Sequence, residues 1–370
     1  MAYYIGVMSG TSLDGVDIAI TSLSKSGEWT FIAGHTFPFP DDLLIKLQHI
    51  INTQQCALID LGEIHVSLGQ FVGQSINQLL QQQQLTKNDI TAIGSHGQTI
   101  FHQPNGSFPF SLQIGDANQI AEITAITTIA DFRQRDIAAG GQGAPLVPAF
   151  HKKLFSSSDE DRVIINIGGI SNITLLVKSP TSQTLGFDTG PGNVLLDSWV
   201  QRHQNKAYDA DGLWAASGQI NNDLLSLFLS DPYFELVIPK STGRELFNTT
   251  WLDQKLEQFK VSLRSVDIQA TLVELTARTI TDDIKRYATN TSAIYVCGGG
   301  SHNRYLLDRL RTLLPNNPVS TTSSLGLHPD WVEACAFAWL AYRTLNHQTG
   351  NLPSVTGANH PVILGAIYPA

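Results

Sequence analysis

The sequence predicts an α/β protein built from two similar units, and three observations support this fold class. The chain has 370 residues, a length that suits two domains better than one core. A series of three strands, helix, strand, helix and strand can be followed twice along it. In both halves the first strand ends in a small polar turn, at residues 9–12 and 168–172. Two such halves would face each other across a cleft, where ligand sites are common.

The first half begins with apolar runs typical of buried strands. Strands are predicted over residues 3–8, 16–22, 29–37, 91–95 and 126–130. Helices are predicted over residues 41–52, 58–84 and 116–124. In the second helix Leu61, Ile64 and Leu68 recur at helical spacing, which predicts one face turned to the core.

The same series begins again after a Gly- and Ala-rich connector at residues 138–145. Strands are predicted over residues 162–167, 173–177, 185–188, 293–297 and 319–321. Helices are predicted over residues 194–202, 266–287, 303–314 and 330–345. We therefore expect a first domain over residues 1–130, with 346–370 as a candidate completion, and a second domain over 131–345.

Composition narrows the class of protein. Hydrophobic residues make up 42% of the chain and charged residues 15%, so an ordinary globular fold is expected. The net charge of -9 disfavours nucleic acid as a partner, because its phosphates would be repelled. Three widely spaced cysteines predict neither a disulfide framework nor a zinc site. The chain shows no signal peptide and no apolar run of about 20 residues, so we expect a cytoplasmic protein that does not bind membranes.

A glycine-bounded turn joins the first two predicted strands. Gly10 and Gly15 have the spacing of a P-loop, but Val16 and Asp17 stand where that loop needs Lys and Ser or Thr. The turn suits a hairpin whose backbone N–H groups approach phosphate oxygens, with Asp14 holding Mg²⁺ directly or through water. An ordinary hairpin turn accounts for the same residues.

Asp188 ends a predicted strand and precedes a glycine-rich turn that leads into a helix. A carboxylate at such a point has a backbone held by the sheet, which favours a role as general base. The alternative is an Asx-turn or helix-cap residue.

Gly298, Gly299 and Gly300 lie between a predicted strand and a predicted helix. Three glycines permit close approach of the backbone to a flat ligand such as adenine or ribose, and the run is entropically costly for a plain connector. The alternative is a helix-entry loop with Asn303 as its N-cap.

Polar residues in three further stretches are candidate ligand groups. His96 and Gln98 follow a predicted strand, where a histidine is more often structural than catalytic. Arg133 and Arg135 suit bidentate binding of a carboxylate, or else a surface salt-bridge cluster with neighbouring aspartates. Glu333 lies near a helix start, where an acidic residue also stabilises the helix dipole.

A family resemblance rests on eight segments in fixed order. They are residues 5–15, 95–99, 112–116, 140–148, 166–172, 186–193, 240–245 and 298–300. Each segment is modest, but the ordered set is specific and covers nearly the whole chain. With these segments the chain resembles the anhydro-N-acetylmuramic acid kinases.

The resemblance implies an actin/hexokinase/Hsp70 fold with ribonuclease H-like domains, ATP and Mg²⁺ as cofactors, a homodimer and a role in peptidoglycan recycling. The implied catalytic residues are Asp188 and Glu333. The implied nucleotide-binding residues are Gly10, Thr11, Ser12, Leu13, Asp14, Gly15, Val16, Asp17, Gly168, Gly169, Gly298, Gly299, Gly300 and Asn303. The implied substrate-binding residues are His96, Gln98, Arg133, Arg135, Thr189 and Gly190.

The implied substrate, 1,6-anhydro-N-acetylmuramic acid, has no free 6-hydroxyl, because O6 is tied in the anhydro bridge. Asp188 is therefore expected to take a proton from a water that attacks the anomeric carbon. The bridge opens, O6 attacks the γ-phosphate of ATP, and the product is N-acetylmuramic acid 6-phosphate. By resemblance Glu333 is a second carboxylate that holds this water, as in inverting glycoside hydrolysis.

Other readings of the residues remain open at this point. One is an ordinary kinase of the same fold that acts on a free sugar hydroxyl or a carboxylate. Another is a non-enzymatic ATP-binding regulator or chaperone-like ATPase. A metal-dependent protease would need a close histidine pair on a helix, which the sequence lacks.

Overall fold

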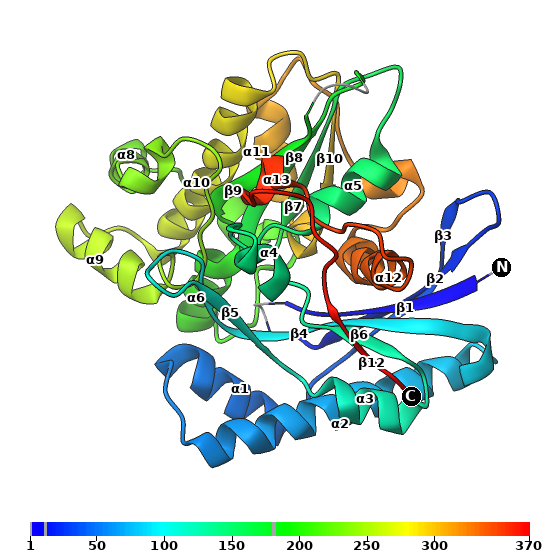
Figure 1. The fold of residues 1–370 in the computed structure, drawn as a ribbon. Helices are drawn as coiled ribbons and strands as arrows, with labels where there is room; N and C mark the ends of the chain where they lie inside the picture. Colours follow the sequence, from blue (N-terminus) through cyan, green and yellow to red (C-terminus); the bar gives the residue numbers. More distant parts are fainter. Residues whose placement is uncertain (1, 11–12, 180–182) are drawn as a thin grey trace. The chain divides into compact units, whose positions relative to one another are not determined.

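The structure, a computed structural model, describes residues 2–10, 13–179 and 183–370 (Figure 1). The chain divides into two compact units, one of residues 1–150 with 331–370 and the other of residues 151–330. These limits differ from the expected ones, which placed residues 131–150 and 331–345 in the second domain. The physical reason for the second difference is the packing of helix α12 on the first unit's sheet, described below.

The first unit contains the strands and helices of both chain ends. Its strands are β1 (Ala2–Ser9), β2 (Val16–Leu23), β3 (Trp29–Phe37), β4 (Ile90–Gln103), β5 (Phe110–Ile114), β6 (Thr128–Ala130) and β12 (Ala366–Tyr368). Its helices are α1 (Asp41–Thr53), α2 (Leu58–Gln82), α3 (Ala117–Thr124), α4 (Gln134–Ala138), α12 (Val332–Leu345) and α13 (Pro353–Thr356), with a 3-10 turn η1 (Lys87–Asp89). Helix α5 (Val147–Phe155) crosses the limit between the units.

The second unit is one continuous segment. Its strands are β7 (Arg162–Ile167), β8 (Ile170–Leu176), β9 (Leu185–Pro191), β10 (Ala293–Cys297) and β11 (Val319–Thr321). Its helices are α6 (Asn193–Gln204), α7 (Leu213–Ala216), α8 (Asn222–Leu229), α9 (Thr249–Phe259), α10 (Ser265–Tyr287) and α11 (Arg304–Leu313). Its 3-10 turns are η2 (Ala210–Gly212), η3 (Pro232–Glu235), η4 (Gly299–His302) and η5 (Thr322–Leu325), and η6 (Pro329–Trp331) ends at its border.

The two sheets share one topology. Among the described residues the strand order is β3-β2-β1-β4-β6-β12 in the first unit, with β5 added beside β4, and β9-β8-β7-β10-β11 in the second. In each sheet the first three strands are antiparallel neighbours, and the first strand pairs in parallel with the fourth. The duplicated α/β fold class predicted from the sequence is therefore confirmed. The β4–β5 hairpin was not predicted, because β5 has only β4 as its neighbour and lacks a buried apolar run.

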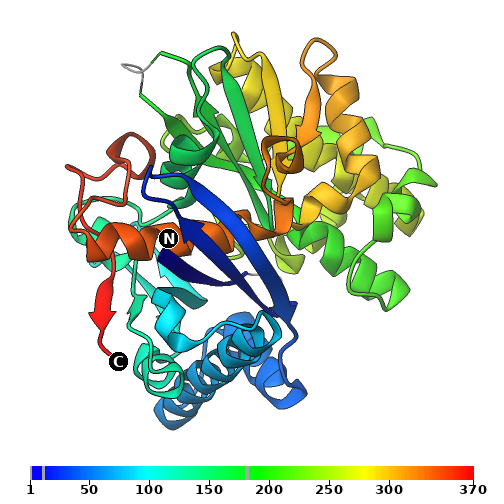
Figure 2. The same cartoon turned by 90° about the vertical axis from the view of Figure 1, so that its right-hand side faces the viewer.

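Helices lie on both faces of the first unit's sheet (Figures 1 and 2). One face packs against α1, α2 and α3 around a buried aliphatic core that includes Ile18, Leu68 and Ile76. Helix α12 covers the opposite face, and its central residues Ala336, Phe337 and Ala338 are buried. Apolar burial on both faces accounts for the buried pattern of β1.

A row of small residues brings α12 unusually close to the sheet. Gly94, Gly6, Ala19 and Gly34 are direct cross-strand partners on β4, β1, β2 and β3. A Cβ atom on Gly6 would lie 1.7 Å from the Ala334 carbonyl oxygen, and one on Gly94 would lie 2.1 Å from the Phe337 carbonyl oxygen. The helix backbone therefore rests directly on the strands, and no larger side chain fits between them.

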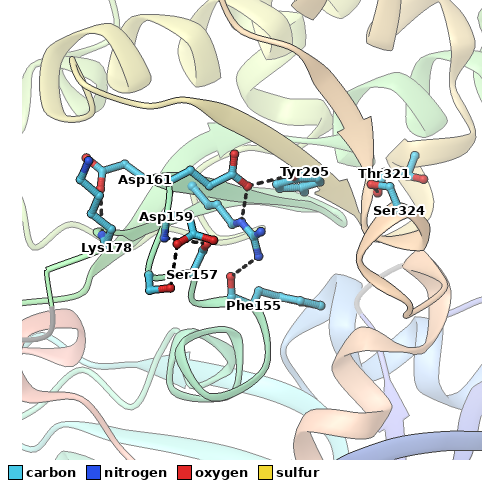
Figure 3. A network of polar contacts seen from close by, with 11 residues as sticks. Phe155, Ser157, Asp159, Asp161, Lys178, Tyr295, Thr321 and Ser324 are labelled. Carbon is cyan, nitrogen blue, oxygen red and sulfur yellow. Dashed lines mark hydrogen bonds and ion pairs between the residues drawn. The ribbon is translucent and has the colours of Figure 1, made fainter.

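The second unit has its own core between the sheet and α6, α8, α9, α10 and α11, with Phe187, Phe228 and Leu272 fully buried. A polar cluster joins α5 to the start of β7 and β10 (Figure 3). Arg162 donates to the Phe155 carbonyl oxygen at 2.9 Å and to Glu160 at 2.7 Å, and Tyr295 donates to Glu160. This cluster lies at the first residue of β7, whereas the glycine turn at residues 168–169 follows the last residue of that strand. We therefore interpret the cluster as structural.

We predict that Gly94→Ala destabilises the protein by about 1–3 kcal/mol, because the new methyl group overlaps the α12 backbone. Urea unfolding followed by circular dichroism measures the difference. The matched control is Gly62→Ala on α2, where a Cβ atom meets nothing within 4 Å. This control should be neutral or slightly stabilising. Equal midpoints for Gly94→Ala and the wild type would contradict the proposed close contact.

Candidate functional site

Asp188 lies on β9 and is buried, with 7% of its surface exposed. Its cross-strand partner on β8 is Asn172, but the next pair along is Ser171 with Gly190, so Thr189 is an extra residue. The Thr189 hydroxyl lies 2.6 Å from the Ser171 hydroxyl and is buried in the sheet. A bulge of this kind bends the strand and changes the direction of the neighbouring side chain.

Three hydrogen bonds tie Asp188 to residues far along the chain. Its backbone N–H donates to the Lys240 carbonyl oxygen at 3.1 Å, and its carbonyl oxygen accepts from the Tyr233 hydroxyl at 2.7 Å. Its Oδ2 accepts from the Thr242 backbone N–H at 3.0 Å. The carboxylate therefore has a fixed orientation, which a general base requires.

The surroundings of Asp188 are rich in buried charge. Lys240 is 4% exposed, and its Nζ lies 3.0 Å from Asp283 Oδ2. Burial raises the pKa of Asp283, while the Lys240 ammonium opposes this shift. Burial, and secondarily the nearby carboxylate of Asp188, raise the pKa of Tyr233 above its ordinary value. Tyr233 therefore stays protonated and continues to donate to the Asp188 backbone.

The glycine turn of the second unit connects β7 to β8. Gly168 and Gly169 are partly exposed, and their carbonyl oxygens accept from the N–H groups of Asn193 at 2.8 Å and Gly192 at 2.9 Å. These bonds join the turn to the start of α6. The predicted nucleotide residues at this turn are thus at the surface and held in place.

The corresponding turn of the first unit is only partly described, because Thr11 and Ser12 lie outside the described residues. Leu13 and Val16 are buried in the core, so only their backbones are candidates for phosphate contact. Asp14 is exposed, and Asp17 accepts a hydrogen bond from Thr36 at 2.6 Å. Gly10 is partly exposed at the start of the turn, whereas Gly15 is buried, and a Cβ there would lie 2.5 Å from the Phe37 carbonyl oxygen.

The three glycines after β10 have different reasons to be glycine. A Cβ on Gly298 would lie 2.4 Å from Asn166 Oδ1, and Gly298 also has a φ of +78°. A Cβ on Gly300 would lie 2.3 Å from Ile167 Cγ2. Packing therefore accounts for these two, whereas a Cβ on Gly299 would meet only Asn193 Nδ2, at an ordinary contact distance of 3.7 Å. Asn303 is the N-cap of α11, because its side chain accepts from the Leu306 N–H at 3.0 Å.

A polar cavity of about 300 Å³ lies within the first unit. Its lining includes Ser95, His96, Gln113, Asp116 and Asp131. Ser95 Oγ and Gln113 Oε1 are buried and have no hydrogen-bond partner within the described residues. Buried polar atoms without partners are normally satisfied by water or ligand, and this volume is that of a small-ligand site.

The side chains of His96 and Arg133 are hydrogen-bonded to each other beside this cavity. The Arg133 guanidinium lies 2.9 Å from His96 Nε2 through Nη2 and donates to the Gly143 carbonyl oxygen at 2.7 Å. Burial, and then the Arg133 charge, lower the pKa of His96 well below its ordinary value, so the imidazole is neutral. Arg135 is exposed on α4. Gln98 is fully buried and bonds to Ser9 at 2.5 Å, so it supports the β1 end and does not face the cavity.

Glu333 lies in the first turn of α12 and is partly exposed. The sequence also allowed a salt-bridge cluster of arginines with aspartates. Asp136 is not part of such a cluster, because its carboxylate accepts hydrogen bonds from Asn351, Thr356 and the Gly143 N–H.

Sequence reasoning missed Tyr233 and Lys240 as partners of Asp188. The only signal was the polar run 240–245, which contains no catalytic pattern by itself.

No group of three or more His, Cys, Asp or Glu side chains suited to a metal ion is found in the described part of the chain. Mg²⁺ in kinases usually takes one or two carboxylates together with phosphate oxygens and water. The exposed carboxylate of Asp14 beside a glycine turn fits that requirement. The search for membrane spans covered the same residues and found no helix long and apolar enough to cross a bilayer.

Two α/β units of one topology, each with a glycine turn after its first strand, are the arrangement of the actin/hexokinase fold class. A family model described as anhydro-N-acetylmuramic acid kinase matches residues 2–370. The anhydro-N-acetylmuramic acid kinase of Pasteurella multocida is 52% identical over 99% of this chain and 97% of its own length. The corresponding kinase of Coxiella burnetii is 49% identical over 99% of this chain and 97% of its own length. The chain belongs to the anhydro-N-acetylmuramic acid kinase family.

We predict that acid destabilises the protein partly through His102, whose Nδ1 lies 2.9 Å from the hydroxyl of Ser111, a residue that lines the polar cavity. Burial, and to a lesser degree Arg133, lower the pKa of His102 from 6.5 to about 4. Between these two values the unfolded chain binds the proton and the folded chain does not, so stability falls as the pH falls. His102→Gln should make this fall shallower by up to about 1.4 kcal/mol per pH unit, measured by urea unfolding at several pH values. Identical pH slopes would contradict the shifted pKa.

Proposed function

We propose that the protein opens the 1,6-anhydro ring of 1,6-anhydro-N-acetylmuramic acid with water and transfers the γ-phosphoryl group of ATP to O6. Family membership makes it a kinase with a small-molecule substrate and ATP as phosphoryl donor. The products are N-acetylmuramic acid 6-phosphate and ADP, which suits peptidoglycan recycling. The observation that carries the assignment of a base is the buried Asp188 carboxylate, oriented by the Thr242 N–H.

The reaction balances through two bond exchanges. Asp188 takes a proton from a water whose oxygen forms a bond to C1, and the C1–O6 bond breaks. O6 then forms a bond to the γ-phosphorus, and ADP leaves. We assign Glu333 the role of the second carboxylate that holds the attacking water. The sugar thus gains one water and one phosphoryl group.

We assign nucleotide binding to the two glycine turns, at residues 10–17 and 168–169, and to residues 298–303. Their backbone N–H groups suit phosphate oxygens, and at Gly299 no side chain would separate the backbone from a flat ligand. Asp14 would hold Mg²⁺, directly or through water, and the ion would neutralise phosphate charge when bound.

We assign sugar recognition to the polar cavity of the first unit and to Thr189 and Gly190 beside Asp188. Ser95 and Gln113 line this cavity and carry groups of the kind that hydrogen-bond to hydroxyl or amide groups. Arg133 acts through His96, whose ring lines the cavity. We further propose that the protein is a cytoplasmic homodimer. A monomer mass measured by light scattering of the purified protein would contradict the dimer.

We predict that Asp188→Asn lowers kcat by about 10²–10⁴-fold, because the amide cannot accept the proton of water. The assay incubates enzyme with MgATP and the anhydro sugar, and follows ADP and product mass. A wild-type product heavier by one phosphate and one water shows coupled ring opening, whereas phosphate alone would indicate an ordinary kinase. The control Asp223→Asn changes an exposed carboxylate of the same unit and should keep the wild-type rate. Near-normal turnover in Asp188→Asn would remove the assignment.

We predict that Arg133→Met raises KM for the anhydro sugar by about 10-fold, because His96 loses the group that orients it. KM for ATP should change by less than about 3-fold. Steady-state kinetics with each substrate varied gives both values. Lys87→Met, which removes an exposed charge on η1, is the control. An unchanged KM for the sugar in Arg133→Met would argue against the cavity as its binding site.

A further inference from the structure

The outer side of β9 is held by a segment without regular strand structure. β9 is the last strand in the order of its sheet, so its outward backbone groups have no neighbouring strand among the described residues. At Asp188 both of these backbone groups are nevertheless bonded, the N–H to the Lys240 carbonyl oxygen and the carbonyl oxygen to the Tyr233 hydroxyl. The same segment supplies the Thr242 N–H to the carboxylate.

Lys240 anchors this segment in the interior of the unit. Its ammonium pairs with Asp283 of α10 at 3.0 Å, and the two side chains are 2% and 8% exposed. The same ammonium lies 5.2 Å from the ring centroid of Tyr233 and 5.7 Å from that of Phe187. Lys240 therefore connects α10 with Phe187, which precedes Asp188 on β9, and with Tyr233, whose hydroxyl donates to the Asp188 carbonyl oxygen.

Stability alone is a weak explanation for this ion pair. Removing two charges from water costs free energy that their attraction repays only in part, and apolar pairs of similar volume are often equally stable. What an apolar pair does not reproduce is the directional hold on the backbone at 240–242. That hold decides where the Asp188 carboxylate points.

We propose that the buried Lys240–Asp283 ion pair is a positioning device for Asp188, acting through the backbone of residues 240–242 and the Tyr233 hydroxyl. The inference rests on the proposed role of Asp188 as the base. A base displaced by a fraction of an ångström loses its alignment with the attacking water, so the pair controls turnover more than binding.

The test replaces the pair by apolar residues, in Lys240→Met with Asp283→Leu. The expected result is a folded protein whose kcat is about 10–100-fold lower, with both KM values within about 3-fold of wild type. Tyr233→Phe keeps the pair and removes only the hydroxyl that bonds the Asp188 backbone, and it should lower kcat by about 3–10-fold. Thermal unfolding of each variant confirms that it is folded.

The control replaces another ion pair on the same helix, Glu274 with Arg309, which lie 2.7 Å apart with side chains 2% and 24% exposed. Glu274→Leu with Arg309→Met should keep kcat within about 2-fold of wild type, because this pair joins α10 to α11 and has no bond to the 240–242 segment. An equal loss of kcat in both pair replacements would overturn the proposal, since the effect would then be one of general stability.

Wild-type kcat in folded Lys240→Met/Asp283→Leu and in Tyr233→Phe would also overturn it. If the double variant does not fold, the comparison of kcat between Lys240→Arg and Tyr233→Phe tests the proposal instead. Lys240→Arg keeps the charge and should retain more activity than Tyr233→Phe, and the reverse order contradicts the proposal. Failure of the proposed function is recognised separately, because Asp188→Asn would then retain turnover whatever the positioning variants do.

Discussion

The first unit depends on direct contact between the backbone of α12 and the backbones of β1 and β4. Gly6 and Gly94 are cross-strand partners, and the carbonyl oxygens of Ala334 and Phe337 occupy the space where their side chains would be. The two contacts join residues 328 positions apart (334 − 6) and 243 positions apart (337 − 94), so residues 331–370 complete the unit that residues 1–150 begin. They also place the start of α12, with Glu333, relative to the strand that ends at Ser9.

In the second unit the buried carboxylate of Asp188 lies on β9, the edge strand of the sheet, and has to be held in one orientation there. Residues 233–242, which are distant from Asp188 in the sequence, supply the groups that hydrogen-bond to its backbone and side chain. The bulge at Thr189 changes the direction of β9 at the same place. Local irregularity next to a regular sheet is common where chemistry is done, because the sheet supplies rigidity and the irregular residues supply direction.

Most of the fold could be predicted because its signals are local. The strands and helices common to the two units follow from apolar periodicity, and their duplicated order indicated two sheets of one topology. Helices α5, α8 and α9 were not predicted. The β4–β5 hairpin could not be predicted, since β5 contains Ser111 and Gln113 and pairs with one neighbour only. The first domain limit was expected at residue 130 and lies at 150, and the second was expected at residue 345 and lies at 330. The second limit differs because α12 belongs to the sheet that its apolar face covers and not to its neighbours in sequence.

Asp188, the glycine turns and the family were recognisable from the sequence by itself, since each depends on residue type and order. Only the tertiary structure decided which groups surround them. The partners of Asp188 come from residues 45 and 54 positions away, and Arg133 meets His96 across 37 positions. Such bonds depend on how strands and helices pack, and local sequence preferences contain no information about them. Likewise, packing showed that Gly298 and Gly300 are required by their neighbours in the second unit while Gly299 is not, a distinction that three identical residues cannot express in sequence.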